Sequence, residues 1–387
     1  MNDARPAAPA PAADLPARLR DRIRRHGSVS FAEFMEAALY DPEGGFYRRV
    51  RVGTGGDFVT SPHVSEAFGA LLAVQVAEWF EALGRPDPFT VVELGAGDGE
   101  LARQLLASLP GQAVARARYL AVERSPALRE AIRAGGLPAV TVLGSLDEVP
   151  APVTGVVLAN EVLDNVPFHR VRRTDRGLVE LRVGLADDRF VLVESPPPPE
   201  LVACAPPLEV GEEAVVMLQG LELFDRALSL LRRGYLLLVD YGWAGPGGRR
   251  DLVHGYRGHR AEEDVLSEPG SRDITAGVDF GALAARAAAR GLPVWGPLPQ
   301  REALLALGFR DWQRRARRRQ LRALDRGRSL EAVRAYAGRS RANLLLDPGG
   351  LGGFLVLCVG VGVDPAVAPR LARPPEAGED RQGWEGS

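Results

Sequence analysis

One acidic residue and three glycines are the residues of this sequence whose spacing most directly indicates chemistry: Glu93, Gly95, Gly97 and Gly99. They lie in the stretch VVELGAGDGEL, which predicts a short buried strand, a sharp turn and a helix that begins at Glu100. Glycine reaches positive φ without strain and lets a ligand approach closer than a Cβ allows. The free N–H groups of the helix, which Asp98 can cap, would suit a carboxylate or a phosphate.

The spacing separates three interpretations of this turn. A dinucleotide-binding turn has the pattern GxGxxG, with its third glycine inside the helix, whereas this turn reads GxGxG. A P-loop needs a lysine, and none follows. An acid two residues ahead of GxGxG is the form that class I methyltransferases use to bind S-adenosylmethionine. We therefore favour a methyltransferase, with Glu93 facing the ammonium group of the cofactor, over a nucleotide-binding protein or a structural turn.

A second carboxylate supports this interpretation. Glu123 ends the next predicted strand, so it is expected at the carboxyl edge of the sheet, beside the glycine turn. There its two oxygens could accept hydrogen bonds from the ribose hydroxyls of a bound adenosine. The alternative is an exposed acid at a strand end that pairs with Arg124. The neighbouring glycine turn favours the ribose-binding role.

Strands and helices that alternate along the chain are expected to position these groups. Short apolar runs predict strands at 89–94, 119–123, 139–143, 153–159, 235–240, 292–295 and 353–361, with helices between most of them. This alternation is typical of an α/β protein. The predicted fold is a Rossmann-like class I methyltransferase sheet, mostly parallel with an antiparallel last strand, with an N-terminal helical region and a β insertion.

Further segments attach to this core. Amphipathic helices are predicted at 15–26 and 30–39, the second opened by a Ser30/Glu33 capping box, and helical spacing resumes at 64–80. Three short strands and a stiff run of prolines at 196–199 predict a β insertion over one edge of the pocket. No regular pattern follows Asp240, and 299–345 is predicted to be helical. The predicted domain organisation is a disordered tail (1–13), an N-terminal helical and lid region (14–88), the methyltransferase core (89–164 and 219–361), the β insertion (165–218) and a disordered tail (362–387).

Composition excludes several classes of function. The 387 residues carry a formal net charge of −2, so no nucleic-acid or membrane partner is predicted. Nine arginines lie between Arg310 and Arg328, and those at positions 314, 315, 317, 318 and 319 go right round a helix, which favours a solvated face over a nucleic-acid patch. The two cysteines are too few for a disulfide framework, and the five histidines form no paired motif, so no metal site is predicted. We expect the protein to be cytoplasmic and do not expect a mitochondrial transit peptide. The sequence is compatible with a homodimer.

Several loops, taken together, resemble one family. In chain order they are SFAEFMEAALYDPEGGFY, GDFVTSP, ELGAGDG, ANEVLDNVPFHRV, and GYRGHR with DITAGVDF. This set, which spans roughly residues 28–361, resembles the MidA family of methyltransferases, whose mitochondrial members act in complex I assembly by methylating an arginine of a core subunit. The resemblance implies a class I fold, S-adenosylmethionine as cofactor and a protein substrate.

The resemblance also implies roles for individual residues. It implies that a GDFxTSP loop covers the cofactor and that an NExxDxxP segment after the fourth core strand presents the substrate. The implied cofactor-binding residues are Gly56, Asp57, Thr60, Ser61, Pro62, Glu93, Gly95, Ala96, Gly97, Gly99, Glu123 and Asn160. Further matches are the DYG at 240–242 and a family-specific segment with Tyr256, Arg257, His259, Arg260, Asp273, Thr275 and Asp279.

The chain departs from the family pattern at three places. Family members usually carry Glu at the position of His63, and often GPGRG or GPGxG at the glycine turn, so Ala96 and Asp98 alter the lip of the cofactor loop. Two aromatic residues of the substrate segment are replaced by Val162 and Leu163. These departures affect the expected substrate more than the expected cofactor.

Methyl transfer to an arginine calls for carboxylates, because the guanidinium pKa lies far above neutral and its charge must be oriented and stabilised. Glu161 and Asp164, with Asn160, are the first candidates; alternatively, Asp164 caps a turn and Glu161 faces solvent. His259 is a candidate base or a loop anchor, and Asp57 has the same two interpretations. The alternatives for function are a small-molecule methyltransferase of secondary metabolism and a non-catalytic assembly factor.

Overall fold

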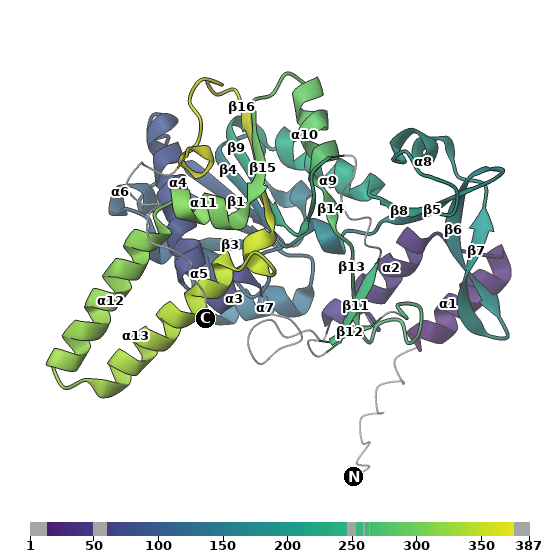
Figure 1. Cartoon of the computed structure of the whole chain (residues 1–387), viewed down its shortest axis with the longest axis horizontal. Coiled ribbons are helices and arrows are strands. Elements are labelled where there is room, and N and C mark those ends of the chain that lie inside the picture. The colour runs from purple at the N-terminus through teal and green to yellow at the C-terminus, as the bar shows by residue number, and fades with distance from the viewer. Residues whose placement is uncertain (1–13, 49–59, 246–252, 258–259, 263, 375–387) are drawn as a thin grey trace, which may run out of the picture. The chain divides into compact units, whose positions relative to one another are not determined.

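The structure, a computed structural model, describes residues 14–48, 60–245, 253–257, 260–262 and 264–374 (Figure 1). The chain divides into two compact units. One comprises residues 1–50, 167–216 and 253–274, and the other comprises 51–166, 217–252 and 275–387. The N-terminal helices therefore share a unit with the segment predicted as an insertion.

The second unit is built on a seven-stranded sheet with the order β15-β16-β9-β4-β1-β2-β3. Neighbours from β9 to β3 are parallel, whereas β16 runs antiparallel to both β9 and β15. The bounds are β1 Phe89–Leu94, β2 Ala117–Val122, β3 Val140–Leu143, β4 Val153–Asn160, β9 Leu231–Asp240, β15 Val294–Pro299 and β16 Leu355–Val361. The predicted fold class, including the antiparallel last strand, is confirmed.

The register of the central strands brings several loops to one edge of this sheet. Leu94, the last residue of β1, pairs with Val122 at the end of β2 and with Ala159 near the end of β4. Asn160 in turn pairs with Val239 near the end of β9. The residues that follow these strands therefore meet at the carboxyl edge, where open α/β sheets bind their ligands.

Helices cover both faces of the sheet, because alternate residues of each strand point to opposite faces. Val91 of β1 is buried in a cluster with α4 and α5, whereas its neighbour Val92 is buried with α9 and α10 (Figure 1). The helices of this unit, apart from a hairpin, are α3 Ser61–Val64, α4 Ala67–Ala82, α5 Glu100–Ser108, α6 Gly111–Val114, α7 Pro126–Ala134, α9 Leu218–Ser229, α10 Phe280–Ala289 and α11 Gln300–Ala306. Single 3₁₀ turns lie at Leu146–Glu148, Leu163–Asn165, Asn343–Leu346, Leu351–Gly353 and Arg370–Ala372.

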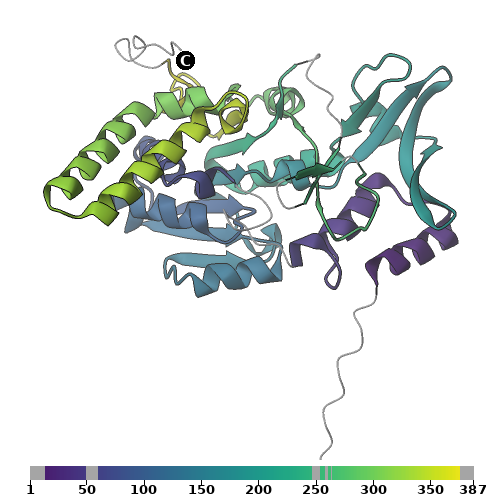
Figure 2. The ribbon, with the colours of Figure 1, turned by 60° about the horizontal axis from the view of Figure 1, so that its bottom comes forward.

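Two longer helices, α12 Phe309–Asp325 and α13 Ser329–Ala342, form a hairpin that projects from this unit (Figures 1 and 2). The base of the hairpin is anchored, because Phe309, Trp312 and Ala316 are buried in the same cluster as α4. Between residues 317 and 336 the buried side chains are those of Ala323 and Ala332. The outer end therefore holds together through small residues on facing helices and has little apolar core.

The first unit joins two N-terminal helices to a four-stranded antiparallel sheet with the order β7-β6-β5-β8. Ser30 Oγ accepts the N–H of Glu33 at 3.1 Å, and Glu33 accepts the N–H of Ser30 at 2.8 Å, so the predicted capping box is confirmed. Phe31 stacks on Phe168 with ring centroids 5.4 Å apart. The bounds are α1 Leu15–His26, α2 Phe31–Tyr40, a 3₁₀ turn Phe46–Arg48, β5 His169–Thr174, β6 Gly177–Ala186, β7 Arg189–Ser195, α8 Pro199–Cys204 and β8 Glu213–Val216.

Two sequence predictions are wrong in detail. The proline run does not stay extended to its end, because α8 begins at Pro199, and proline suits the first turn of a helix. The stretch after Asp240 also contains regular structure, namely β10 Gly242–Trp243, β11 His254–Arg257, β12 Arg260–Glu262, β13 Asp273–Thr275 and β14 Val278–Asp279. Strands of two to four residues are too short to show an alternating pattern in the sequence.

Candidate functional site

The glycine turn between β1 and α5 has the backbone that its sequence predicts. Gly95, Gly97 and Gly99 have φ values of 61°, 58° and 87°, in the left-handed region. A Cβ on Gly95 would lie 2.7 Å from Val162 Cγ2, so this glycine is needed for packing. A Cβ on Gly97 would have no neighbour within 4 Å among the described residues, and the space above the turn is therefore open. Ala96 is buried, and its N–H donates to the carbonyl of Val122 at 3.2 Å.

Glu93 lies at the end of β1, beneath this turn. Its carboxyl is 3% exposed and accepts a hydrogen bond from the Tyr119 hydroxyl at 2.7 Å. The pKa of the Glu93 carboxyl is raised to about 8, mainly by burial; the charges of Glu123 and Asp98 add to the rise, and the Tyr119 hydrogen bond opposes it. At neutral pH this acid is therefore mostly protonated until a cation approaches it.

Glu123 follows β2 and points back to the glycine turn. One carboxylate oxygen accepts the N–H of Gly97 at 2.9 Å, and the other accepts the N–H of Ser125 at 2.7 Å. The side chain is buried, and burial raises the pKa of its carboxyl despite these hydrogen bonds. The alternative of an exposed acid at a strand end is therefore wrong. A ribose above Gly97 would lie beside this carboxylate.

A histidine in α3 closes the other side of the turn. His63 Nε2 lies 3.0 Å from Asp98 Oδ2, and the hydroxyl of Thr60 lies 2.8 Å from His63 Nδ1. Burial alone would raise the pKa of Asp98, but the His63 contact and a backbone N–H bring it below its ordinary value. The sequence pointed to both residues as departures from the family pattern, without indicating that they form a pair.

Two further contacts hold α3 against the site. The N–H of Ser61 donates to Glu161 Oε1 at 2.8 Å, and Gln104 of α5 donates to the carbonyl of Pro62 at 2.7 Å. The described part of the predicted lid loop, which includes Thr60, therefore contacts both the glycine turn and the loop after β4. Gly56 and Asp57, the other predicted lid residues, lie outside the described residues.

The loop after β4 begins with two candidate residues side by side. Asn160 Nδ2 donates to Glu161 Oε1 at 3.1 Å, and Glu161 has a φ of 55°, unusual for a residue with a side chain. Burial raises the pKa of the Glu161 carboxyl. Because this carboxylate accepts the N–H of Ser61, the alternative that it faces solvent is wrong. Asn160 Oδ1 is buried and has no hydrogen-bond partner among the described residues.

Asp240, at the end of β9, organises the rest of this loop. Its Oδ2 accepts the N–H groups of Val162, Leu163 and Asp164 at 3.2, 3.0 and 3.2 Å. Its Oδ1 accepts the N–H of Tyr241 at 2.9 Å. Burial raises the pKa of Asp240, and the charge of Glu161 adds to the rise. Sequence reasoning noted the DYG motif but gave Asp240 no role, because its partners are remote in the chain.

Asp164 is buried in the 3₁₀ turn after β4, and its carbonyl accepts the N–H of Ala276 at 3.1 Å. The second unit thus brings Asp164 together with Glu161 and Asp240. His259, the fourth predicted catalytic residue, lies outside the described residues. Among the described residues, no group of three or more metal-ligating side chains is found.

S-adenosylmethionine fits this edge of the sheet on three observations. No described residue fills the space above Gly97, the buried acceptor Asn160 Oδ1 lacks a protein donor within the same ranges, and acids surround the turn. Such surroundings suit a ligand that carries a sulfonium and an ammonium group. Together with the antiparallel β16 inserted in a parallel sheet, this site defines a class I S-adenosylmethionine-dependent methyltransferase.

Comparisons with known proteins agree with the site. Residues 71–298 match the model of a family described as "putative S-adenosyl-L-methionine-dependent methyltransferase", and the chain belongs to this family. It is 34% identical over 328 residues to the mouse protein arginine methyltransferase NDUFAF7, mitochondrial, covering 74% of this chain and 72% of the relative. A homolog from Drosophila melanogaster is 30% identical over 391 residues, covering 90% of this chain and 85% of the relative.

A solved structure from Burkholderia thailandensis, bound to S-adenosyl-homocysteine, is similar along the whole chain. It has 29% sequence identity and a TM-score of 0.78, and the match covers 96% of this chain and 99% of that one. The similarity therefore includes both compact units.

The expected cytoplasmic location is contradicted by the relatives. The mouse and Drosophila proteins are both named as mitochondrial. The expectation rested on the small number of cysteines, which indicates a reducing compartment but does not distinguish the cytoplasm from other reducing compartments. Within the described ranges, no helix is both long enough and apolar enough to cross a bilayer.

Proposed function

We propose that the methyl acceptor is an arginine side chain of a protein, that Glu161 and Asp164 hold its guanidinium, and that Asp240 positions the loop that carries Asp164. The mouse and Drosophila relatives are named protein arginine methyltransferases. The observation that carries the proposal is the proximity of Glu161 to Asp240: the N–H of Glu161 donates to the carbonyl of Val239, the residue before Asp240, at 2.8 Å. The charge of Glu161 accordingly raises the pKa of Asp240. A guanidinium that Glu161 holds would be stabilised by the charge of both carboxylates.

The same proposal assigns the cofactor contacts. The glycine turn supplies the surface, Glu123 accepts from the ribose hydroxyls, and Asn160 Oδ1 accepts from a polar group of the ligand. Glu93 supplies negative charge beneath the amino acid end. The full set of proposed contacts is Gly56, Asp57, Thr60, Ser61, Pro62, Glu93, Gly95, Ala96, Gly97, Gly99, Glu123 and Asn160. When bound, S-adenosylmethionine supplies a methyl group activated by a positively charged sulfur.

The acid pair suggests how the acceptor loses its proton. Asp240 accepts four backbone N–H groups, whereas Glu161 Oε1 accepts one backbone N–H and one amide N–H. Asp240 is therefore better stabilised as a carboxylate, and Glu161 keeps the proton that two neighbouring buried acids retain. A guanidinium cation would displace that proton to solvent, and the ionised Glu161 would then take the proton that the acceptor nitrogen loses as it gains the methyl group. His259 remains a second candidate base.

Methylation of a cell lysate tests this function. Purified protein is incubated with lysate and isotope-labelled S-adenosylmethionine, and the products are identified by mass spectrometry. We expect labelled methylarginine in a protein, and we expect Glu161→Gln to lose this product while it still binds S-adenosyl-homocysteine. Label in a small molecule would support the metabolic alternative. Cofactor binding without any transfer would support a non-catalytic assembly factor.

A further inference from the structure

Exposed apolar side chains concentrate at the outer end of the α12–α13 hairpin, residues 317–336. Nine large apolar side chains are exposed in the described residues, and five of them lie in this segment. They are Leu321, Leu324, Leu330, Val333 and Tyr336, between 49% and 65% exposed. On each helix they recur every three residues, so each helix presents one apolar stripe to solvent. Clustered exposed apolar residues mark interaction surfaces.

The same segment is strongly basic. Residues 317–336 contain seven arginines and two acidic residues, although the whole chain has a net charge of −2. Arg328 pairs with Glu331 at 3.3 Å, and Arg319 with Glu66 at 3.5 Å. The other five arginines have no acidic partner among the described residues: Arg317, Arg318, Arg322, Arg326 and Arg334. Their positive charge is therefore available to an external anion.

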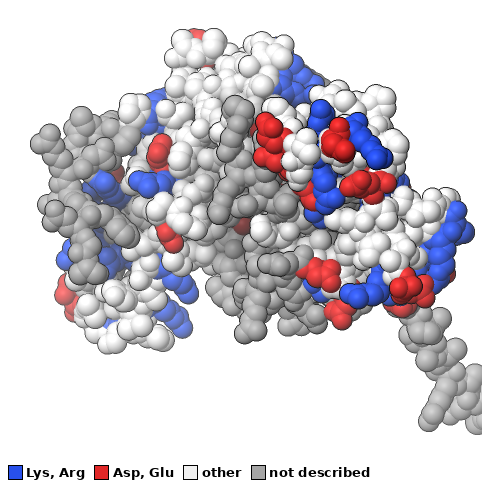
Figure 3. Space-filling model, turned by 45° about the vertical axis from the view of Figure 1, so that its right-hand side comes forward, with Lys and Arg blue, Asp and Glu red and all other residues white. Residues whose placement is uncertain are grey.

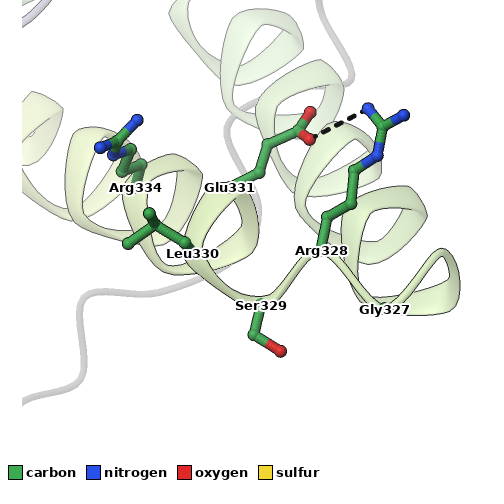
Figure 4. A pocket seen from close by; sticks show the side chains of 6 residues that line it. All are labelled: Gly327, Arg328, Ser329, Leu330, Glu331 and Arg334. Atoms are coloured by element: carbon green, nitrogen blue, oxygen red, sulfur yellow. Dashed lines mark hydrogen bonds and ion pairs between the residues drawn. The ribbon is translucent and has the colours of Figure 1, made fainter.

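The turn of the hairpin is hollowed. A depression of about 630 Å³ is lined by Gly327, Arg328, Ser329, Leu330, Glu331 and Arg334. In Figure 4, Leu330 and Arg334 lie together on α13, and the Arg328–Glu331 pair lies on the other side. The guanidinium of Arg334 beside the aliphatic side chain of Leu330 matches the chemistry of a phospholipid, in which a phosphate adjoins acyl chains.

The arrangement favours a membrane over other anionic partners. Nucleic acid would pair its phosphates with the arginines, but its sugar–phosphate backbone has no apolar surface to cover the five exposed apolar side chains. An acidic protein surface would cover one side of the hairpin, whereas the arginines from 317 to 322 are spread over about 200° of the circumference of α12, at about 100° per residue. A projecting end that dips into a lipid interface can bury apolar side chains while its arginines reach the surrounding headgroups.

We propose that residues 317–336 are a docking surface for a membrane that contains anionic phospholipids. The sequence prediction of no membrane partner rested on the net charge of the whole chain, and the arginines of this segment were interpreted as a solvated face. The exposed apolar side chains between them favour a membrane surface instead. Docking in this manner is peripheral and requires no helix that spans the bilayer. The proposal does not depend on the methyl acceptor.

Vesicle binding by the full-length protein tests this inference. Co-sedimentation is measured with phosphatidylcholine vesicles, with and without phosphatidylglycerol. We expect binding to the anionic vesicles only, falling with added salt. The charge variant is Arg317→Glu/Arg318→Glu/Arg322→Glu, and the apolar variant is Leu324→Ser/Leu330→Ser/Val333→Ser. The controls are Arg118→Glu/Arg232→Glu/Arg301→Glu and Val202→Ser/Val210→Ser, which change exposed residues elsewhere.

The charge variant should lose at least about tenfold in binding, because each basic residue near an anionic surface contributes about fivefold. The apolar variant should also lose at least about tenfold, because it removes side chains that would be buried in the lipid interface. Both controls should stay within about twofold. In a second measurement, the emission of Leu330→Trp should shift to shorter wavelength on anionic vesicles. No binding by the unaltered protein, or an equal loss in the controls, would overturn the inference. If the protein binds single-stranded RNA and the apolar variant binds it equally well, the inference is also overturned and a nucleic-acid partner is favoured.

Discussion

His63 in α3 and Asp98 in the glycine turn interact directly, with Nε2 and Oδ2 3.0 Å apart. The two residues are 35 positions apart in the chain, and their contact joins the lid segment to the cofactor turn. In the family that the sequence resembles, Glu is usual at the first position and Arg is frequent at the second. In this chain His63 and Asp98 occupy these two positions and contact each other.

A double-mutant cycle on this pair should show coupling. We expect His63→Ala and Asp98→Asn each to weaken the binding of S-adenosyl-homocysteine severalfold, because each releases α3 from the turn. The double variant should be little weaker than either single variant, with a coupling energy of about 1 kcal/mol. The exposed pair Arg85 and Glu81, at 2.6 Å, serves as the control and should leave affinity unchanged. Strictly additive losses at His63 and Asp98 would contradict a direct interaction.

Gly97→Val should abolish cofactor binding, because the branched side chain fills the open space above the turn. The substitution also costs about 1–2 kcal/mol of folding free energy, since φ is positive. Gly136→Val is a matched control: Gly136 has a φ of 64°, and its Cβ would also meet nothing within 4 Å among the described residues. Both variants should lose similar stability in thermal unfolding, and only Gly97→Val should lose affinity in calorimetry. Equal affinities would place the ligand elsewhere.

Glu93→Gln should stabilise the protein at alkaline pH. The folded pKa of Glu93, about 8, lies above its ordinary value of 4.5, so ionisation opposes folding. The contribution of this acid to stability is complete below about pH 4.5 and is lost as the pH rises through about 8. Glutamine still accepts the Tyr119 hydrogen bond and does not ionise. In thermal unfolding, the advantage of the variant should therefore grow between about pH 5 and about pH 9. A difference that is constant with pH would show that Glu93 has no raised pKa.

Asp240→Asn should impair catalysis more than cofactor binding. The carboxylate holds the loop of Val162, Leu163 and Asp164 through three N–H groups, and an amide reproduces only part of this pattern. We expect kcat for methyl transfer to fall by about a hundredfold, because the loop that carries Glu161 and Asp164 is misplaced. The affinity for S-adenosyl-homocysteine should change by less than about threefold. Asp347→Asn alters a carboxylate that accepts the N–H of Gly349 at 3.1 Å, and it should change neither quantity. An unchanged kcat in Asp240→Asn would exclude a positioning role.

Features that depend on one continuous stretch of chain were predictable from the sequence. The strand 89–94 and the positive φ of Gly95, Gly97 and Gly99 follow from local residue types, because glycine, β-branched residues and caps act within a few positions. The order of strands and helices was predictable for the same reason, since each element carries its own apolar period.

Features that depend on contacts between remote segments could not be predicted. Nothing near His63 indicates that Asp98 is its partner, and nothing near Asp240 indicates the three N–H groups that it accepts. The exposure of Leu330 and Val333 could not be predicted either, because a stripe of apolar residues on a helix usually implies a buried face.

The central claim is that S-adenosylmethionine binds at the carboxyl edge of β1 and β2, with its ribose held by Glu123. Isothermal titration calorimetry with S-adenosylmethionine on the unaltered protein and on Glu123→Ala tests this claim most directly. We predict a dissociation constant of order micromolar for the unaltered protein and a loss of at least about tenfold in the variant, with a lower unfolding temperature because the N–H groups of Gly97 and Ser125 lose their acceptor. No heat at about millimolar ligand, or equal affinity in Glu123→Ala, would contradict the account.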